Sequence, residues 1–449
     1  MPNPAIDYYH QLLTDGALAE QTFEELQSGL IRNRLIFGGR SLSPYLRPHF
    51  ITSAEWNFVT RACETVWSAL QKVKEAAIDD NSLLDQLGIN GLERELVKID
   101  PGYGHVSPTS RLDSFLTGDA YSFVELNGES PAGIAYADSA SEIYLRLPAM
   151  KKFSERYRLR RFEGRPKLLE VLLRCWDEFC GGRADREPVI AIVDLRGLPT
   201  QKEFELFKDF FEEQGYNALI CAPEDLEFDD SGLYFGGVKI DVVYKRLLVN
   251  EYLPIMDEYP ALLEAYRAGA VCVVNSFRGK LVHKKAIFTI LTDPEFAALF
   301  SDAELEAIRK HVPWTRRLRE SKTDNFGETI DLIEWTRRNA SELVLKPNDD
   351  YGGHGIFIGW TLDADEWDEA IQTALANGDY LVQRRVKTSK EMFPMMLDDL
   401  GHWEMAEQLV DLDPLLFNGA VGSAFTRLSL SELANVSSGG GMVPTFVIE

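Results

Sequence analysis

The spacing of hydrophobic and polar positions predicts a helical beginning to this chain. Residues 9–34 and 54–77 carry apolar side chains three and four positions apart, which is the period of an amphipathic helix. Ser53 stands directly before the second stretch and is a candidate N-cap. The apolar run 96–100 is a candidate strand. We therefore expect a helical N-terminal region over residues 1–95.

A strand with two different faces is predicted over residues 121–127. Apolar and polar side chains alternate there, which is the period of a half-buried β-strand. Successive side chains of a strand point to opposite faces. Alternation therefore predicts that Glu125 and Asn127 share one face and that Val124 and Leu126 share the other.

Three oxygen-bearing side chains in and before this strand are candidate metal ligands: Asp113, Glu125 and Asn127. Mg²⁺ binds through one or two carboxylates and completes its octahedron with water and substrate phosphates. The alternative is an ordinary strand whose polar face is only solvated, as polar strand faces commonly are.

Residues 188–275 alternate strand and helix patterns. Residues 188–194 form a β-branched run, a helical pattern covers 200–214, and 217–221 form a second strand. A β-α-β unit implies parallel strands with a right-handed crossover. No Gly-x-Gly-x-x-Gly turn follows the first strand, so no dinucleotide is assigned. We expect a small Rossmann-like layer here.

A glycine-rich loop separates two short apolar runs, 342–346 and 356–360. The first run ends at Lys346, whose ammonium is a suitable point charge for a phosphate. Backbone N–H groups can approach phosphate oxygens at three glycines: Gly352, Gly353 and Gly355. The pattern is not a P-loop, because no Gly-Lys-Ser/Thr follows. It predicts either a phosphate-binding lid or an ordinary hairpin tip.

The last third of the chain predicts further strands. A helical pattern over 364–376 leads to a short strand at 379–384, which could place Gln383 against an adenine edge. Residues 403–448 are β-rich and include a second glycine-rich loop at 435–441.

Composition narrows the class of protein. The chain has 449 residues, 45% of them hydrophobic, so two to four subdomains with real cores are expected. The formal net charge of −24 argues against a nucleic-acid or membrane partner bound by bulk electrostatics. Five scattered cysteines without Cys-x-x-Cys spacing, and the lack of a secretory pattern, point to the cytoplasm.

Taken together, these motifs resemble the circularly permuted ATP-grasp family, and within it the synthetase domain of glutathionylspermidine synthase-like proteins. In ordinary ATP-grasp enzymes the metal-binding acid and Asn follow the lysine-bearing hairpin, whereas here they precede it, as a permuted order implies. The resemblance runs over about residues 97–449. It rests on the following motifs: Arg111-x-Asp113, Glu125-x-Asn127, Lys285-Ala-Ile-Phe, Leu345-Lys346-Pro347 with the Gly352–Gly355 loop, Leu381-Val-Gln383, Arg427 and Asn435.

The resemblance implies a role for each matching residue. Mg²⁺ bridging the ATP phosphates would be bound by the three candidate ligands named above. The glycine loop would close over the phosphates, Gln383 would line the adenine pocket, and Arg111 would neutralise charge at the reacting centre. The phosphates themselves would be held by Lys285 and Lys346. The family usually has Asn directly before the first lysine, so Lys284 and Lys285 are not told apart.

The expected fold is a multi-subdomain α+β or α/β protein, a circularly permuted ATP-grasp with a Rossmann-like preATP-grasp subdomain. Its expected parts are 1–95, 96–187, 188–276 and 277–449. The expected function is an ATP-dependent ligase that joins a small-molecule or peptide carboxylate to an amine through an acyl phosphate. The alternatives are a phosphotransferase on the same scaffold and a non-catalytic nucleotide-binding protein.

Overall fold

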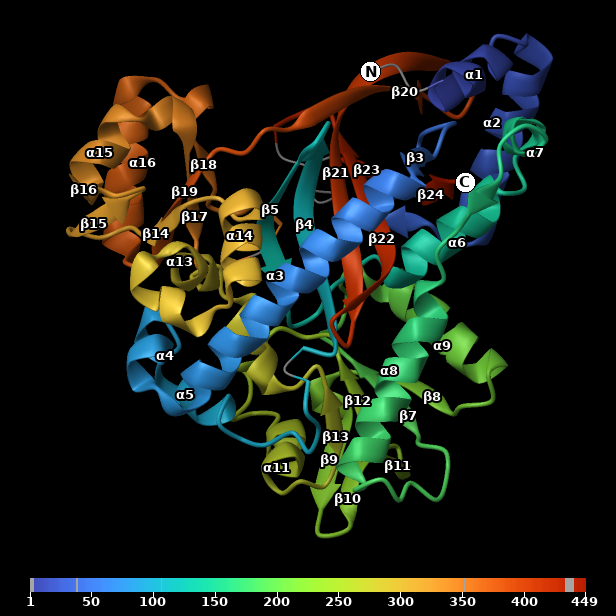
Figure 1. Ribbon diagram of the computed structural model, residues 1–449. Helices are drawn as coiled ribbons and strands as arrows, with labels where there is room; N and C mark the ends of the chain where they lie inside the picture. Colours follow the sequence, from blue (N-terminus) through green and yellow to red (C-terminus); the bar gives the residue numbers. More distant parts are fainter. Residues whose placement is uncertain (1–3, 38, 106, 351, 433–439) are drawn as a thin grey trace.

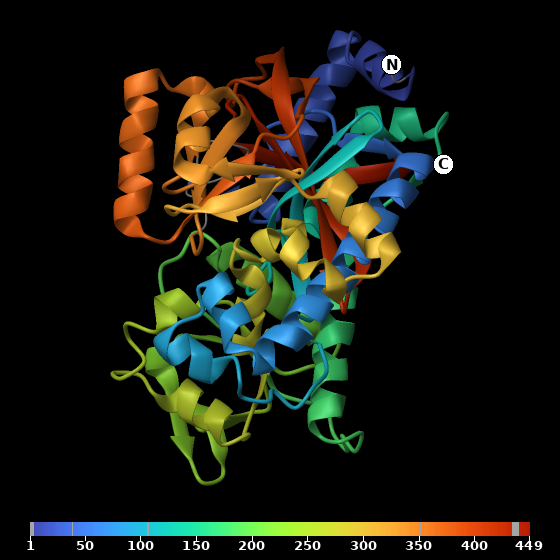
Figure 2. The same cartoon turned by 60° about the vertical axis from the view of Figure 1, so that its left-hand side comes forward.

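The computed structural model describes residues 4–37, 39–105, 107–350, 352–432 and 440–449 (Figure 1). It combines a large antiparallel sheet, a parallel sheet and a smaller antiparallel sheet with helices packed around them (Figures 1 and 2). Most of the second glycine-rich loop predicted at 435–441 lies outside the described residues. No described helix is long and apolar enough to cross a membrane.

The N-terminal region is mainly helical, as the apolar spacing predicts. Its helices are α1 (Pro4–Leu12), α2 (Gly16–Arg32), α3 (Ser53–Asp79), α4 (Asn81–Leu87) and α5 (Gly91–Leu96). The short strands β1 (Ile36–Phe37), β2 (Arg40–Ser41) and β3 (His49–Thr52) lie between α2 and α3.

Two local predictions in this region are wrong. The N-cap of α3 is Thr52 rather than Ser53, because the Thr52 hydroxyl accepts from the Glu55 N–H in a capping box. Residues 96–100 do not form a strand. The N–H groups of Val97 and Lys98 donate to carbonyls of α5, so the apolar run finishes a helix instead.

The large sheet has the order β23-β22-β21-β4-β5, with β20 paired to β21. The long helix α3 crosses one face of it (Figure 1). Leu112, Leu126 and Leu412 belong to the apolar cluster that also includes Trp67 and Leu70 of α3. The strands are β4 (Thr109–Thr117), β5 (Ala120–Asn127), β20 (Ser389–Met396), β21 (Trp403–Phe417), β22 (Ala420–Ser429) and β23 (Gly441–Val443).

A β-bulge in β5 changes which face of the sheet its side chains point to. The β4–β5 register shifts between Asp113 and Ser114, whose partners are Glu125 and Phe123, so Val124 is the extra residue. Leu126 therefore packs in the core beneath α3, whereas Val124 packs in a separate cluster with Phe115. The prediction that Val124 and Leu126 share a face is wrong.

The parallel sheet has the order β13-β12-β7-β8, and its strands run parallel, as the β-α-β pattern predicts. Its elements are β7 (Ile190–Val193), α9 (Gln201–Glu213), β8 (Ala218–Cys221), β12 (Val242–Lys245), α10 (Val249–Tyr252), α11 (Ala261–Arg267) and β13 (Cys272–Val274). A small antiparallel sheet adjoins it: β9 (Leu226–Asp229), β10 (Gly232–Phe235) and β11 (Val238–Ile240).

The third sheet has the order β14-β19-β17-β18 and contains the predicted hairpin around the glycine loop. Helices α15 and α16 accompany it, on the left of Figure 1. Its strands are β14 (Thr315–Arg317), β17 (Leu343–Pro347), β18 (Phe357–Ile358) and β19 (Tyr380–Arg384), and its helices are α15 (Leu332–Arg338) and α16 (Ala364–Asn377). Between β14 and α15 in the chain, β15 (Lys322–Asn325) and β16 (Glu328–Asp331) form a separate two-stranded antiparallel sheet.

The remaining elements connect these sheets. Helices α12 and α13 carry the first candidate lysine region between the parallel sheet and the third sheet. The connecting elements are α6 (Ile134–Tyr144), α7 (Pro148–Ser154), α8 (Gly164–Phe179), α12 (Lys280–His283), α13 (Ile287–Thr292) and α14 (Asp302–His311). Strands β6 (Leu159–Arg160) and β24 (Thr445–Ile448) form a further sheet with β3, in the order β3-β24-β6.

Candidate nucleotide and metal site

Strands β4 and β5 bring four of the predicted site residues side by side. Arg111 pairs with Asn127, and Asp113 pairs with Glu125, in the antiparallel register. Directly opposed residues of an antiparallel pair have neighbouring side chains on the same face. The predicted grouping of Asp113, Glu125 and Asn127 is therefore present in the structure.

The Asp113 carboxylate is surrounded by donors. One oxygen accepts from Arg111 Nε at 2.8 Å and from Asn127 Nδ2 at 2.9 Å. The other accepts from the Arg111 guanidinium at 3.3 Å and from the Arg427 guanidinium at 2.6 Å. Burial alone would raise the pKa of Asp113, but the two guanidinium groups hold it well below its ordinary value.

Two further aspartates complete this cluster, and sequence reasoning missed both. Asp411 and Asp413 of β21 are buried and ion-paired to Arg427 at 2.5 and 2.9 Å. Burial and the neighbouring carboxylates raise the pKa of Asp413 well above its ordinary value, even though Arg427 opposes the shift. The available signal was the Asp-Leu-Asp alternation on a strand.

The two adjacent lysines point to different partners. The Lys285 ammonium lies 3.7 Å from Glu125, and it also donates to the Asp350 carbonyl. The Lys284 ammonium instead donates to the Gly88 carbonyl and forms an ion pair with Glu93 at 2.9 Å. The structure therefore brings Lys285, and not Lys284, to the acidic strand.

Lys346 approaches the same strand from the third sheet. Its ammonium donates to the Val124 carbonyl at 3.1 Å and to Gln383 Oε1 at 2.8 Å. Burial lowers the pKa of Lys346 to about 8, with nearby Glu125 opposing the shift and Lys285 adding to it. The end of β17 thus lies against the bulge of β5.

Both ends of the Gln383 side-chain amide are hydrogen-bonded. Its carbonyl accepts from Lys346, and its amide donates to Thr315 Oγ1 at 3.1 Å. Thr315 and Lys346 lie on β14 and β17, which flank β19. Gln383 therefore orients Lys346, and its predicted contact with adenine stays a prediction.

The glycine loop requires backbone conformations that only glycine adopts readily. Gly352, Gly353 and Gly355 have φ angles of 70°, 80° and 67°. The Gly355 carbonyl accepts from the Tyr380 hydroxyl at 3.0 Å, and a Cβ on Gly355 would lie 2.7 Å from that hydroxyl oxygen. Any side chain at Gly355 would displace the loop from β19.

Of the three predicted metal ligands, Glu125 and Asn127 suit a hard cation better than Asp113 does. The Glu125 side chain is 17% exposed, and its carboxylate lies 3.7 Å from the Lys285 ammonium, too far for a short hydrogen bond. Asn127 directs its amide nitrogen to Asp113, which leaves its carbonyl oxygen as the end that suits a cation. Asp113 fits less well, because four donors occupy its oxygens and a cation would have to displace one of them.

Comparison with known proteins identifies the fold. A family profile described as circularly permuted ATP-grasp type 2 matches residues 48–428. A solved apo structure of a glutathione synthetase-like effector from Globodera pallida superposes with a TM-score of 0.63 at 15% identity. That superposition covers 96% of this chain and 97% of the effector chain, so the two proteins share their fold.

Two Frankia proteins are distant relatives in sequence. One, from Frankia casuarinae, is provisionally named glutamate–cysteine ligase 2-2 and is 24% identical over 72% of this chain. The other, from Frankia alni, is provisionally named glutamate–cysteine ligase 2-3 and is 25% identical over 58% of this chain. The matches cover 36% and 30% of those proteins, so the chain spans about a third of the length of these relatives.

Proposed function

This chain belongs to the circularly permuted ATP-grasp type 2 family, and from that membership we propose that it is an ATP-dependent carboxylate–amine ligase. The observation that carries the proposal is the meeting of Lys285 and Lys346 with the polar face of β5. Both ammonium groups lie beside Glu125 or its neighbouring carbonyl. Two cations that face oxygen ligands on a strand suit a nucleoside triphosphate bound together with a divalent cation.

In the proposed reaction, a carboxylate oxygen of the acid attacks the γ-phosphorus of ATP, and the bond to the bridging oxygen breaks to release ADP. The amine then attacks the acyl carbonyl, phosphate leaves, and the amine loses a proton. The first step is needed because a carboxylate has no acceptable leaving group, whereas an acyl phosphate does. Mg²⁺ held by Glu125 and Asn127 would neutralise charge on the phosphates.

The chain's own residues have distinct tasks in this proposal. Lys285 and Lys346 bind the phosphates as point charges. Arg111, fixed by Asp113, faces the charge that develops during phosphoryl transfer. The glycine loop covers the phosphates and excludes water, which would otherwise hydrolyse the acyl phosphate.

The proposal extends to the chemical class of the acid and the amine. The resemblance to glutathionylspermidine synthase-like synthetases favours a peptide-like acid with an amino acid or polyamine as the amine. The names of the Frankia relatives support amino acids as substrates. We propose an amino acid or short peptide as the carboxylate donor.

The test is ADP release by the purified protein with Mg²⁺ and ATP, against panels of amino acids, short peptides and polyamines. A ligase releases ADP only when acid and amine are both present and forms an amide detectable by mass spectrometry. A stable phosphorylated product without amine would show a phosphotransferase instead. Failure to bind ATP by calorimetry would contradict both.

A further inference from the structure

A second group of charged side chains lies where the third sheet meets α12 and the N-terminal helices. It holds three cations and three anions, and no side chain in it is more than 13% exposed. We call it the buried charge network, and its members are Lys245, Lys280, Lys284, Glu93, Glu129 and Asp349. The sequence left Lys284 open as an alternative to Lys285, and none of the other five residues is a predicted ligand of the nucleotide.

Lys280 joins the two sides of the candidate site. Its ammonium lies 3.0 Å from Glu129, which follows the acidic strand β5, and 2.6 Å from Asp349, which follows the lysine strand β17. The network therefore spans the junction between the two strands that carry the proposed ligands.

Helix α12 can approach the end of β5 so closely because of two glycines. A Cβ on Gly279 would lie 2.9 Å from the Gly128 carbonyl oxygen, and one on Gly128 would lie 2.8 Å from a methyl carbon of Val282. Both distances are too short for a real side-chain carbon. This contact fixes Lys280 beside Glu129.

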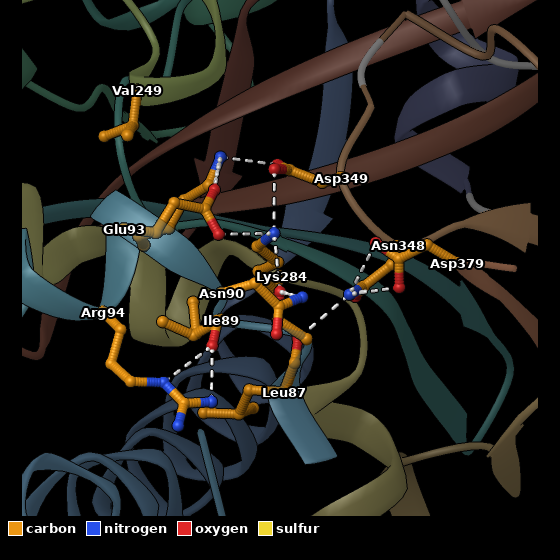
Figure 3. Close-up of polar contacts among 12 residues, drawn as sticks. Leu87, Ile89, Asn90, Glu93, Arg94, Val249, Lys284, Asn348, Asp349 and Asp379 are labelled. Atoms are coloured by element: carbon orange, nitrogen blue, oxygen red, sulfur yellow. Dashed lines mark hydrogen bonds and ion pairs between the residues drawn. The ribbon is translucent and has the colours of Figure 1, made fainter. Parts of the chain in front are cut away.

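Asp349 also receives the second lysine of the network. Lys284 lies 3.2 Å from Asp349 and 2.9 Å from Glu93 of α5, as Figure 3 shows. The preceding residue, Asn348, donates to the Leu87 carbonyl at 2.9 Å and accepts from the Ala286 N–H at 2.8 Å. The chain that leaves β17 is thus held on both sides.

The contacts of Lys280 make this group a poor candidate for a metal site. Ligand atoms of Glu129, His283 and Asp349 are close enough together for a cation. The Lys280 ammonium already bonds both carboxylates, however, and supplies the positive charge there.

Stability is a weak reason for such a network. Burying ions carries a large desolvation penalty, and a well-packed apolar group often stabilises a fold as well or better. Ion networks do fix geometry, because each charge must keep its partners. The backbone fixed here is that of residues 348–350, where the Asp350 carbonyl accepts from Lys285.

We propose that Asp349 is a positioning residue of the proposed ligase. Held by Lys280 and Lys284, it fixes the chain between β17 and the glycine loop, and through that chain it places Lys285 at the acidic strand. The inference rests on the proposed function for its catalytic consequence. The anchoring itself can be tested without activity.

The main test is Asp349→Asn, which keeps the size of the side chain and removes its charge. We expect the KM for ATP to rise about tenfold, the equivalent of ~1.4 kcal/mol, with kcat changed less than threefold. A purely structural residue would lower the amount of active protein and leave KM unchanged. Asp365→Asn, on an exposed turn of α16, is the matched control and should change neither constant.

Variants of Lys284 test whether Asp349 acts through its ion pair with this lysine. Lys284→Arg keeps the charge and should retain a near-normal KM, whereas Lys284→Met should raise it. In the double variant Lys284→Met, Asp349→Asn the increase in KM should be smaller than the product of the single increases, because the residues act through one another. Independent, multiplicative effects would overturn the proposal.

Amide hydrogen exchange of peptides ending near residue 350 gives a readout besides activity. Exchange in the free protein should be faster in Asp349→Asn than in the wild type, and unchanged in Asp365→Asn. Unchanged exchange with an unchanged KM would overturn the anchoring. If wild-type protein bound no ATP but exchange still accelerated, the proposed function would fail while the anchoring would stand.

Discussion

Lys285 follows α12 and Glu125 lies on β5, far apart in the chain, yet their charged atoms are 3.7 Å apart. This pair joins the lysine region after α12 to the acidic strand β5. Each residue offers one half of a phosphate and metal site: a cation for the nucleotide and an oxygen ligand for a divalent ion. Separate variants can therefore distinguish the two halves.

Lys285→Met should weaken ATP binding by about 10- to 100-fold, the effect expected from losing a charge-assisted hydrogen bond to phosphate. Titration calorimetry with ATP and Mg²⁺ measures this directly. Lys151→Met, at an exposed lysine on α7, is the control and should bind normally. Normal ATP affinity in Lys285→Met would remove Lys285 from the site.

Glu125→Gln should weaken the dependence of ATP binding on Mg²⁺ rather than binding in general. The amide keeps the shape of the side chain but lacks the negative charge that a hard cation prefers. ATP titrations at several Mg²⁺ concentrations should show a smaller gain in affinity than the wild type. The exposed Glu227→Gln variant of β9 should keep the full gain. An unchanged Mg²⁺ dependence in Glu125→Gln would contradict the assignment.

The strand that carries Glu125 and Asn127 could be predicted from the sequence, because burial of one face makes apolar and polar side chains alternate along it. The sequence was not enough to place Val124. The bulge depends on how β5 pairs with β4, and no local pattern at 121–127 records that pairing. The run at 96–100 is too short for its apolar spacing to separate a strand from the end of a helix. Hydrogen bonds to carbonyls of α5 make it the end of that helix.

The choice between Lys284 and Lys285 shows a second limit. Neighbouring lysines at the end of a short helix have the same local chemistry, so only their distant partners separate them. The Lys284 ammonium pairs with Glu93 and donates to the Gly88 carbonyl, whereas the Lys285 ammonium lies near Glu125. Asp411 and Asp413 were missed because their partner Arg427 lies on the next strand.

Asp113→Asn should destabilise the fold much more than Asp413→Asn. The first change removes a carboxylate that the buried Arg111 and Arg427 guanidinium groups share, a loss of about 3–5 kcal/mol. Burial and the neighbouring carboxylates raise the pKa of Asp413 and so make its charge less favourable, so that losing this charge should cost about 1 kcal/mol or less. Urea unfolding at pH 7 compares them, and equal losses would contradict the assigned charges.

Asp194, at the end of β7, should make stability depend on pH. Burial raises its pKa to about 7 against the opposing charge of Arg246, whereas the ordinary value is 3.8. Between these values the folded state binds the proton more tightly than the unfolded state, so this contribution to stability is lost as pH rises towards 7. From pH 5 to pH 8 the wild type should lose about 2–3 kcal/mol relative to Asp194→Asn. Urea unfolding across that range measures the difference, which the exposed Asp230→Asn variant should not reproduce. Parallel stability profiles for wild type and Asp194→Asn would show that Asp194 is ionised throughout.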